Sequence, residues 1–408
     1  MKIEAVIVGN ELLNGDLADT NTATFGRLLR RQGLRLLRGQ TVPDDPDAIA
    51  SAVQSAAMRS DLVLISGGLG PTEDDITVAS VAQSADLAMV RDQEALEALR
   101  TRYEGRGFKF TMNNAKQVDH PEGGALLPNA KGTAPGVRMD LKGATLFFFP
   151  GVPRELNHLA ERHLLPWLQE HANVRPYQSV MFKTFGWTES MVAETVRALG
   201  IAAPVHVAYR AHFPEIHVSL HALGDSEEDS ALQLRTHAHR VRKALGPLVF
   251  TEDPTMSLAK VVIQRLLERS ETVAIGESCT GGLVAKILTD VPGSSATVLE
   301  GIVAYSNASK SARLQVPETL IERHGAVSEE VARAMAEGAR VTAGATWGIG
   351  ITGIAGPGGG TESKPTGMVH IAVAHETMTK HVCQTYPFGR TRNRVVSAHA
   401  ALDMIRRF

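Results

Sequence analysis

The sequence predicts an α/β protein built from three successive regions. Its 408 residues suggest two or three domains at roughly 150 residues each. Strand-like and helix-like periods alternate at both ends of the chain, which favours sheets with helices on their faces. Between them lies a small α+β pattern, bounded by polar and Pro-containing segments. We therefore place the regions at residues 1–170, 171–250 and 251–408.

The first region shows three apolar strands and three amphipathic helices. The strands are expected at residues 4–9, 60–66 and 144–151, and the helices at 22–34, 94–105 and 154–170. The apolar runs are short and bounded by Gly, Pro or Asp, as is typical of buried strands. This pattern predicts a sheet covered by helices.

The middle and last regions follow in the same way. In the middle region we expect a strand at 177–186, a helix at 188–199, a hairpin at 205–223 and a helix at 227–245. In the last region the expected helices are 257–270, 282–290, 328–344 and the C-terminal segment, and the expected strands are 272–276, 301–306, 346–352 and 368–374. The last region is thus a second α/β domain.

Composition excludes several classes of protein. Hydrophobic residues make up 43% of the chain and charged residues 21%, as in an ordinary globular protein. A formal net charge of −2 argues against a surface that coats nucleic acid. Two cysteines make no disulfide framework, and no apolar run approaches the roughly 18 residues that span a membrane. We expect a cytoplasmic protein without membrane or nucleic-acid partners.

Three polar residues stand out in the stretch GSSATVLEGIVAYSNASK at 293–310. They are Ser295, Tyr305 and Lys310. The stretch is an ordinary strand and turn, or it holds the nucleophile and base of an amide-cleaving site. Lysine acts as a base only when neutral, which requires its pKa to fall by ~3 units, or roughly 4 kcal/mol. A short-chain dehydrogenase is a poorer match, because the Tyr-to-Lys gap here is five rather than four.

Three further segments of the last region suit an anionic ligand. GESCTGG at 276–282 offers backbone N–H groups to an oxyanion or phosphate, or simply caps a helix through Ser278 or Thr280. ITGIAGPGGG at 351–360 permits close backbone approach, although it is not a Walker loop. Arg390 and Arg394 share one helical face, which suits a phosphate ester or a solvated basic turn.

As a set, the segments ESCTGG, GSS, YSN-x-x-K, HGAVSEE and GIAGPGGG resemble the C-terminal domain of the CinA family, the nicotinamide mononucleotide (NMN) deamidases. The resemblance implies hydrolysis of NMN to nicotinate mononucleotide and ammonia without a cofactor. It implies Ser295 as the nucleophile, activated by Lys310 and Tyr305. The residues expected to bind substrate are Ser278, Thr280, Gly281, Gly353, Gly356, Arg390 and Arg394.

The first region carries SGGLGPTEDDIT at 66–77, directly after an apolar strand. In one interpretation, the glycine N–H groups bind phosphate oxygens and the aspartates bind a divalent metal. In the other, the segment is a glycine turn followed by the acidic start of a helix. Polar residues also follow the other apolar runs, where open α/β sheets bind ligands. The region resembles the MoaB/MogA-like molybdopterin-binding fold in the version found at the N-terminus of CinA proteins.

That version is associated with metal-dependent ADP-ribose pyrophosphatase activity. The resemblance implies phosphate binding by Gly67, Gly68, Gly70, Thr72, Asn113, Gly132 and Thr133. It implies a divalent ion (Mg, Mn or Co) held by Glu11, Asp19, Asp74 and Asp75. The middle region would be the KH-like linker of the family, although it lacks the GxxG loop of RNA binders.

Together these resemblances imply a bifunctional, homodimeric enzyme of pyridine-nucleotide (NAD) recycling that acts on NMN and ADP-ribose. Two alternatives stay open. One is a binding protein associated with competence or DNA damage, and the other is a molybdopterin-binding protein that lacks one of these activities.

Overall fold

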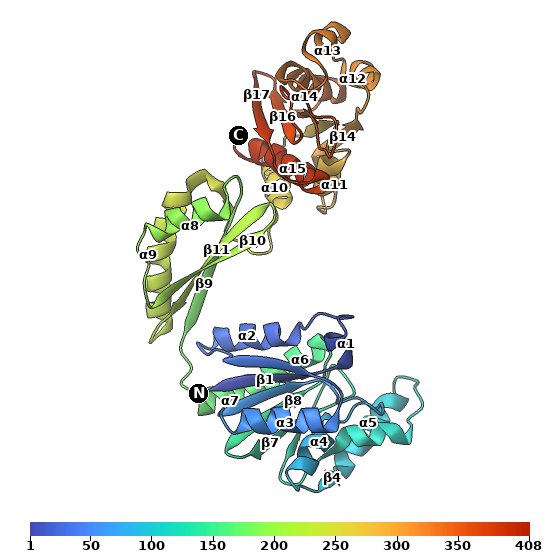
Figure 1. Ribbon diagram of the computed structural model, residues 1–408, viewed down its shortest axis with the longest axis vertical. Coiled ribbons are helices and arrows are strands. Elements are labelled where there is room, and N and C mark those ends of the chain that lie inside the picture. The colour runs from blue at the N-terminus through green and yellow to red at the C-terminus, as the bar shows by residue number, and fades with distance from the viewer. The chain divides into compact units, whose positions relative to one another are not determined.

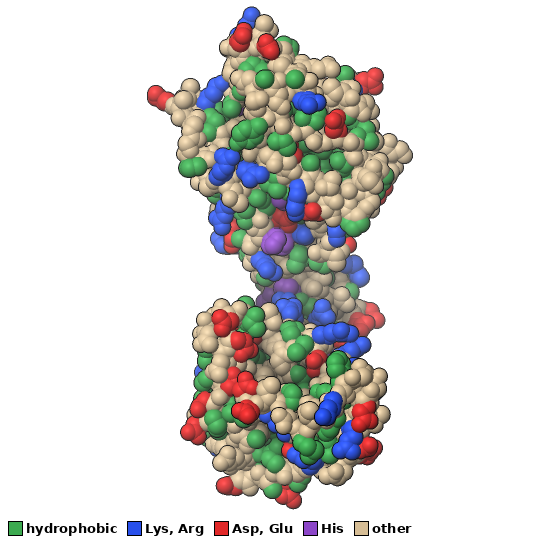
Figure 2. All heavy atoms as spheres, turned by 90° about the vertical axis from the view of Figure 1, so that its right-hand side faces the viewer, with side chains coloured by type: hydrophobic (Ala, Val, Ile, Leu, Met, Phe, Trp, Pro, Cys, Tyr) green, Lys and Arg blue, Asp and Glu red, His purple; other side chains and the backbone are tan.

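The computed structural model describes all 408 residues (Figure 1). The chain forms two compact units, residues 1–178 with 223–230 and residues 179–222 with 231–408. On the face drawn in Figure 2, Lys and Arg side chains lie among Asp and Glu side chains in both units. None of the helices combines the length and the apolar character that a membrane-spanning segment requires.

The first unit contains a six-stranded sheet in the order β2-β1-β3-β8-β7-β6. Its strands β1, β2, β3 and β8 are parallel, and β7 and β6 are antiparallel additions at one edge. The strands of this unit are β1 (Ile3–Val8), β2 (Arg38–Val42), β3 (Leu62–Ser66), β4 (Met89–Arg91), β5 (Asp119–Pro121), β6 (Ala125–Leu127), β7 (Gly136–Leu141) and β8 (Ala144–Phe149). Its helices are α1 (Asn10–Leu13), α2 (Asn21–Arg31), α3 (Pro46–Ala57), α4 (Thr77–Ser84), α5 (Gln93–Glu104), α6 (Pro153–Leu159) and α7 (Leu165–His171), with a 3-10 helix at Met112–Val118.

Helices cover both faces of this sheet because its central strands are apolar on both sides. Alternate residues of β1 enter different cores: Val6 and Val8 pack with α3 and α4, whereas Ala5 and Ile7 pack with α2, α6 and α7. The result is a three-layer α/β/α domain, which confirms the predicted fold class.

Sequence reasoning missed several elements of the first unit, namely β2, α3, α4 and the antiparallel strand β7. The predicted helix at 154–170 is also divided by a π-helical turn at Ala160–Leu164, just before Pro166. Proline lacks the N–H that would continue the regular ladder, which accounts for the irregular turn before it.

The middle of the chain forms a four-stranded sheet in the order β10-β11-β9-β12 with two helices. Its elements are β9 (Tyr177–Thr184), α8 (Glu189–Arg197), β10 (Val205–His212), β11 (Glu215–Leu223), α9 (Glu227–Leu245) and β12 (Val249–Thr251). This is the small α+β region that the sequence predicts.

The last part of the chain has a five-stranded sheet in the order β14-β13-β15-β16-β17. Strand β13 pairs in parallel with β14 and β15, and β16 and β17 are antiparallel. The elements are α10 (Leu258–Glu268), β13 (Val273–Glu277), α11 (Leu283–Thr289), β14 (Val298–Val303), α12 (Asn307–Leu314), α13 (Glu318–His324), α14 (Glu329–Ala343), β15 (Trp347–Gly353), β16 (Met368–His375), β17 (Met378–Thr385) and α15 (Arg390–Arg406).

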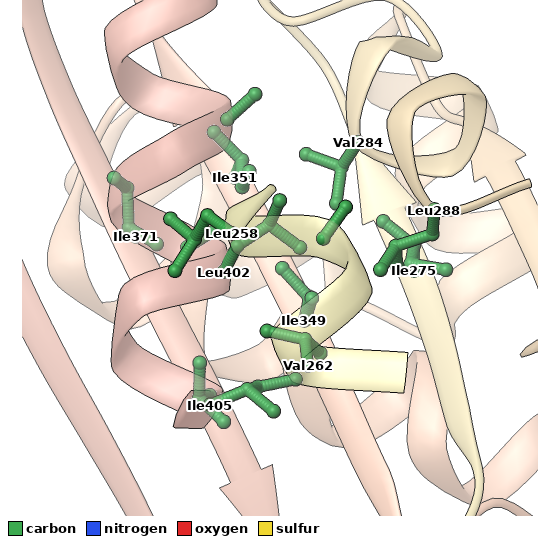
Figure 3. Packing of buried hydrophobic residues seen from close by; sticks show 14 of the residues in the cluster. Leu258, Val262, Ile275, Val284, Leu288, Ile349, Ile351, Ile371, Leu402 and Ile405 are labelled. Carbon is green, nitrogen blue, oxygen red and sulfur yellow. The ribbon is translucent and has the colours of Figure 1, made fainter. Parts of the chain in front are cut away.

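The two faces of this sheet pack differently. Branched side chains such as Ile275, Ile349 and Ile371 fill one face against α10, α11 and α15 (Figure 3). On the other face Ala372 and Ala374 meet alanines of α14, so that helix lies close to the sheet. Close packing of this kind holds α14, and the elements that pack on it, in fixed positions.

The sequence analysis missed α12, which carries Lys310. The segment NASKSARL is only eight residues long, too short to show a clear helical period, and its start is marked only by Ser306, whose side chain accepts a hydrogen bond from the backbone N–H of Ser309. Helix α12 packs on α14 at Gly338, where an added Cβ would lie 1.8 Å from the carbonyl oxygen of Leu314. Gly338 therefore sets how closely the Lys310 helix approaches.

We expect Gly338→Ala to lower the free energy of unfolding by ~1–3 kcal/mol, because the new methyl group overlaps the Leu314 carbonyl. The matched control is Gly26→Ala in α2, where nothing lies within 4 Å of an added Cβ. There alanine should raise stability by ~0.5–1 kcal/mol through helix propensity. Thermal unfolding of the full chain measures both changes, and equal effects of the two substitutions would contradict this packing.

Candidate functional site

The carboxyl end of β13 is the point where the C-terminal sheet reverses its strand order. From β13 the chain passes first to β14 on one side and later to β15 on the other. Open α/β sheets bind ligands in the crevice outside such a switch point. The turn at residues 278–282 leaves β13 here, and residues 304–310 leave β14 at the same edge.

Ser278 and Lys310 meet at this edge. The amine Nζ of Lys310 lies 3.1 Å from Oγ of Ser278 and donates to the carbonyl oxygens of Ala304 at 3.0 Å and Tyr305 at 3.2 Å. The Lys310 side chain is almost fully buried, with 1% of its surface exposed. Helix α12 thus aims its lysine back at the first residue after β13.

The surroundings of Lys310 favour its neutral form. Burial lowers the pKa of its amine from the ordinary value near 10.5, and no carboxylate forms an ion pair with it. A neutral amine has two N–H groups, which the carbonyls of Ala304 and Tyr305 accept, and one lone pair. That lone pair is then available to accept the hydroxyl proton of Ser278. The arrangement is that of a general base and a nucleophile.

Contacts on three sides hold the turn that carries Ser278. Its backbone N–H donates to the carbonyl of Ile351 in β15 at 2.9 Å. The buried carboxylate of Glu277 accepts from the N–H groups of Val284 and Ala285 at 3.2 and 3.0 Å, in the first turn of α11. Arg394 donates twice to the carbonyl of Thr280, at 3.1 and 2.7 Å. The serine is therefore presented by a braced loop.

The neighbouring thiol does not compete as nucleophile. Cys279 is buried, and burial raises the pKa of its thiol to about 12. A thiol attacks as its thiolate, which is then scarce at neutral pH.

The structure does not bring Ser295 beside Lys310. Ser295 is exposed in a 3-10 turn, Ser294–Ala296, that precedes β14, whereas Tyr305 and Lys310 follow the other end of that strand. The six residues of β14 extend over about 20 Å. An extended strand cannot fold back on itself, so its length separates the two ends.

The side chain of Tyr305 does not form the expected proton relay in this structure. The Tyr305 side chain is 60% exposed, and its hydroxyl oxygen accepts from Arg390 at 3.1 Å rather than lying between a serine and Lys310. Tyr305 reaches Lys310 only through its backbone carbonyl. Its phenol belongs to the outer rim of the site.

The predicted substrate-binding residues separate into two groups. Arg390 is exposed, bonds Tyr305 and the carbonyl of Gly356 at 2.9 Å, and has no acidic partner. Arg394 instead braces the Ser278 turn, together with Gly281, whose φ is +60°. Gly353 is required by packing, because an added Cβ would lie 2.6 Å from the carbonyl oxygen of Met368. The hydroxyl of Thr280 is buried without a hydrogen-bond partner.

Sequence reasoning missed two residues that shape the site, Glu277 and Asn393. Asn393 is buried, donates to the carbonyl of Ala355 at 3.1 Å and accepts from the N–H of Phe388 at 3.2 Å. It thereby ties the glycine-rich loop after β15 to the start of α15, beside Arg390. An acid at the end of the apolar run VAIGE is the signal that marks Glu277 in the sequence.

A second site lies at the switch point of the N-terminal sheet. Strand β1 lies between β2 and β3, and the glycine turn at 67–70 follows β3. Gly67 has φ +112°, and an added Cβ would lie 2.1 Å from the carbonyl oxygen of Val8. The turn therefore lies directly against the end of β1.

The acidic segment after this turn is organised by Thr72. Its hydroxyl bonds the carboxylates of Asp74 and Asp75, and its backbone N–H donates to Asp75 at 2.8 Å. The bond from Thr72 is the main cause that lowers the pKa of Asp74. The amine of Lys116 bonds the carbonyls of Thr72 and Asp75. A cavity of about 130 Å³ is lined by Gly68, Gly70, Asp75, Lys116 and Gln117, among others.

The four acids expected to hold a metal do not converge. Asp19 uses both carboxylate oxygens to bond Asn21 and Thr22 at the start of α2. The Glu11 carboxylate packs against Gly9. No group of three or more His, Cys, Asp or Glu side chains is arranged to hold a metal ion. Only Asp74 and Asp75 come together, through the hydroxyl of Thr72, so the four acids do not form one ligand set for the expected divalent ion.

The structure connects one of the other three predicted phosphate ligands to this site. Asn113 is exposed in the 3-10 helix, and its buried neighbour Asn114 bonds Tyr103 instead. The N–H of Gly132 donates to the side chain of Asn129 at 3.0 Å. Thr133 accepts from Gln117 at 3.4 Å. Only Thr133 thus connects directly to a residue of the phosphate-loop cavity.

Comparisons with known proteins agree on all three regions. Residues 4–170 match the family model of a probable molybdopterin binding domain. Residues 179–251 match the damage-inducible protein CinA KH domain, and residues 255–408 match the CinA C-terminal domain. A CinA-like protein from Anaeromyxobacter dehalogenans is 42% identical over 100% of this chain and 99% of its own length. One from Geotalea uraniireducens is 39% identical over 100% and 97%.

Solved structures cover single regions of the chain. The competence/damage inducible protein CihA from Agrobacterium tumefaciens is 40% identical and covers 36% of this chain and 90% of its own, with a TM-score of 0.36. The molybdopterin biosynthesis enzyme MoaB from Thermus is 21% identical and covers 42% and 92%, with a TM-score of 0.29.

Proposed function

Because the chain belongs to the CinA family, we propose that its C-terminal domain hydrolyses the carboxamide of NMN to nicotinate mononucleotide and ammonia. The observation that carries the proposal is the 3.1 Å contact between Ser278 and a buried lysine amine without a carboxylate partner. A serine with a neutral lysine base is a known solution to amide cleavage.

In the first step neutral Lys310 takes the hydroxyl proton of Ser278, and Oγ bonds to the carboxamide carbon. The carbonyl oxygen of the substrate becomes an oxyanion. The backbone N–H groups of Thr280 and Gly282 have no acceptor within the protein and belong to the same turn, so they are the donors available to it. Each such donor typically contributes ~10²–10³ in rate.

Collapse of this intermediate breaks the C–N bond. The protonated Lys310 gives its proton to the departing nitrogen, which leaves as ammonia, and nicotinate stays esterified to Ser278. Lys310, neutral again, then takes a proton from water, and the resulting hydroxide attacks the ester. The proton passes back to Ser278, and nicotinate mononucleotide leaves. The lysine thus acts as base and acid in turn.

The rim of the site suits the phosphate of NMN. Arg390 is exposed and free of acidic partners, and its bonds to Tyr305 and Gly356 fix the position of its guanidinium. A fixed guanidinium offers paired donors to a phosphate. We place the phosphate here and the carboxamide at Ser278.

A second candidate function concerns the N-terminal domain, for which we propose binding and cleavage of a nucleotide pyrophosphate such as ADP-ribose. What supports it is the single cavity that Gly68, Gly70, Asp75 and Lys116 share at a switch point. Glycine N–H groups and a lysine are a usual cradle for phosphate oxygens. No metal-dependent step is included, since the acids do not assemble a metal site.

Ser278→Ala should reduce the rate of ammonia release from NMN by more than about 10³-fold, because the attacking atom is lost. Ser295→Ala is the matched control: it removes an exposed hydroxyl from the same domain and should leave turnover unchanged. A coupled ammonia assay on both variants measures this. If Ser295→Ala is inactive and Ser278→Ala keeps its activity, Ser295 is the nucleophile. If neither the variants nor the wild-type protein hydrolyse NMN, the result favours a binding protein.

The kcat/KM for NMN should rise with pH as Lys310 loses its proton, and then level off. Since burial lowers the pKa of this amine, the midpoint should lie below the ordinary value near 10.5. Lys310→Arg should be inactive throughout, because arginine stays charged. Activity that falls across this limb, or an active Arg variant, would exclude the neutral-base role.

Asp75→Asn should slow release of AMP from ADP-ribose by about tenfold or more, because it weakens the charge-assisted hydrogen bonds from Thr72 that order the loop lining the phosphate-loop cavity. Asp47→Asn, at an exposed position in the first turn of α3, serves as control. Chromatographic detection of AMP is the readout. Equal rates of AMP release for both variants and the wild-type protein would show that Asp75 has no role in this site.

A further inference from the structure

A second cavity of about 280 Å³ adjoins the phosphate-loop cavity of the N-terminal domain. It is lined by Arg102, Tyr103, Arg106, Phe108 and Thr133. Two of these are guanidinium groups and two are aromatic rings. Its volume is just below the range for whole ligand sites, roughly 300–1,000 Å³, and suits a single ring-bearing fragment.

The charges in this second cavity lack partners. Neither Arg102 nor Arg106 forms an ion pair with an acid, and the charge of Arg106 helps lower the pKa of Arg102 after the larger effect of burial. Arg102 nevertheless stays in place, because it donates to the carbonyls of Asn129 and Ala130, the latter at 2.6 Å. The acidic charge of Glu155 also acts on Arg102, but neither arginine is in a salt bridge, and two such positive charges favour an electron-rich or anionic ligand.

Phe108 gives this cavity an open apolar surface. Its side chain is 64% exposed, although a phenylalanine gains most by burial. Tyr103 at the same cavity is held by a bond from its hydroxyl to Asn114 at 3.1 Å and by edge contact with Phe110. Exposed aromatic rings beside arginines are the platforms on which nucleobases stack.

Gln117 and Thr133 connect the two cavities. Gln117 lines the phosphate-loop cavity, and its amide nitrogen donates to the hydroxyl of Thr133, which lines the second cavity, at 3.4 Å. Gln117 is only 6% exposed, yet its Oε1 has no hydrogen-bond donor. A buried acceptor without a donor is costly unless a ligand supplies one. Ribose hydroxyls between a phosphate and a base are such donors.

We propose that the cavity at Arg102, Tyr103, Arg106 and Phe108 binds the nucleobase of a nucleoside phosphate. Its ribose lies at Gln117 and Thr133, and its phosphates lie at the Gly67–Gly70 turn. The proposal rests on the nucleotide-binding function proposed above and names the part of the substrate that the domain recognises besides phosphate.

Calorimetric titration of the full chain with AMP and with ribose 5-phosphate tests this assignment. Both carry the phosphate and the ribose, but only AMP carries a base. In the wild-type protein AMP should bind about tenfold more tightly than ribose 5-phosphate. Phe108→Ala should remove most of this difference, and Phe108→Tyr should restore it. Met58→Ala, at another exposed apolar side chain of the same domain, should leave it unchanged.

The outcomes separate the two proposals. If AMP keeps its full advantage in Phe108→Ala, or if both ligands weaken equally, the base site is elsewhere although nucleotide binding stands. If neither ligand binds the wild-type protein, the proposed nucleotide function of this domain fails as well.

Discussion

The C-terminal site depends on one buried amine that has no carboxylate to neutralise it. Lys310 meets only oxygen atoms of a serine and two backbone carbonyls, and burial of a cation without a counter-charge is unfavourable. Loss of the proton removes this unfavourable charge and leaves a lone pair on the amine, which can act as the base that the reaction requires. The order of proton transfers proposed for this domain follows from that neutral state.

Both α/β domains place their polar groups by the same topological rule. In each sheet a turn enters the crevice at the point where the strand order reverses: the Ser278 turn follows β13, and the glycine turn at 67–70 follows β3 beside the end of β1. Hydrogen bonds hold both turns in place. Glu277 and Arg394 hold the turn of Ser278, and Thr72 and Lys116 hold the acidic segment near Gly70. Braced backbone limits reorganisation when a ligand binds or reacts.

The sequence predicted the fold classes and most buried strands, because apolar runs and alternating patterns depend on local order in the chain. It predicted the lysine but not its serine. Ser278 and Ser295 both lie in polar turns, and only the length and direction of β14 decide which of them meets Lys310. Helix α12 was missed for a related reason, since a helix of eight residues is too short to be stable by itself and depends on packing against α14. The acids expected to hold a metal were chosen by motif, and the structure uses Asp19 as a helix cap instead.

The most direct test is the ionisation of the Lys310 amine itself, independent of any substrate. Labelling of lysine side chains at the carbon next to Nζ permits a titration by NMR, and the Lys310→Arg spectrum identifies the resonance. The account predicts that this amine titrates clearly below the ordinary value near 10.5 while the exposed lysines do not. A Lys310 amine that stays protonated up to or beyond that value would contradict the account, because the serine would then have no base.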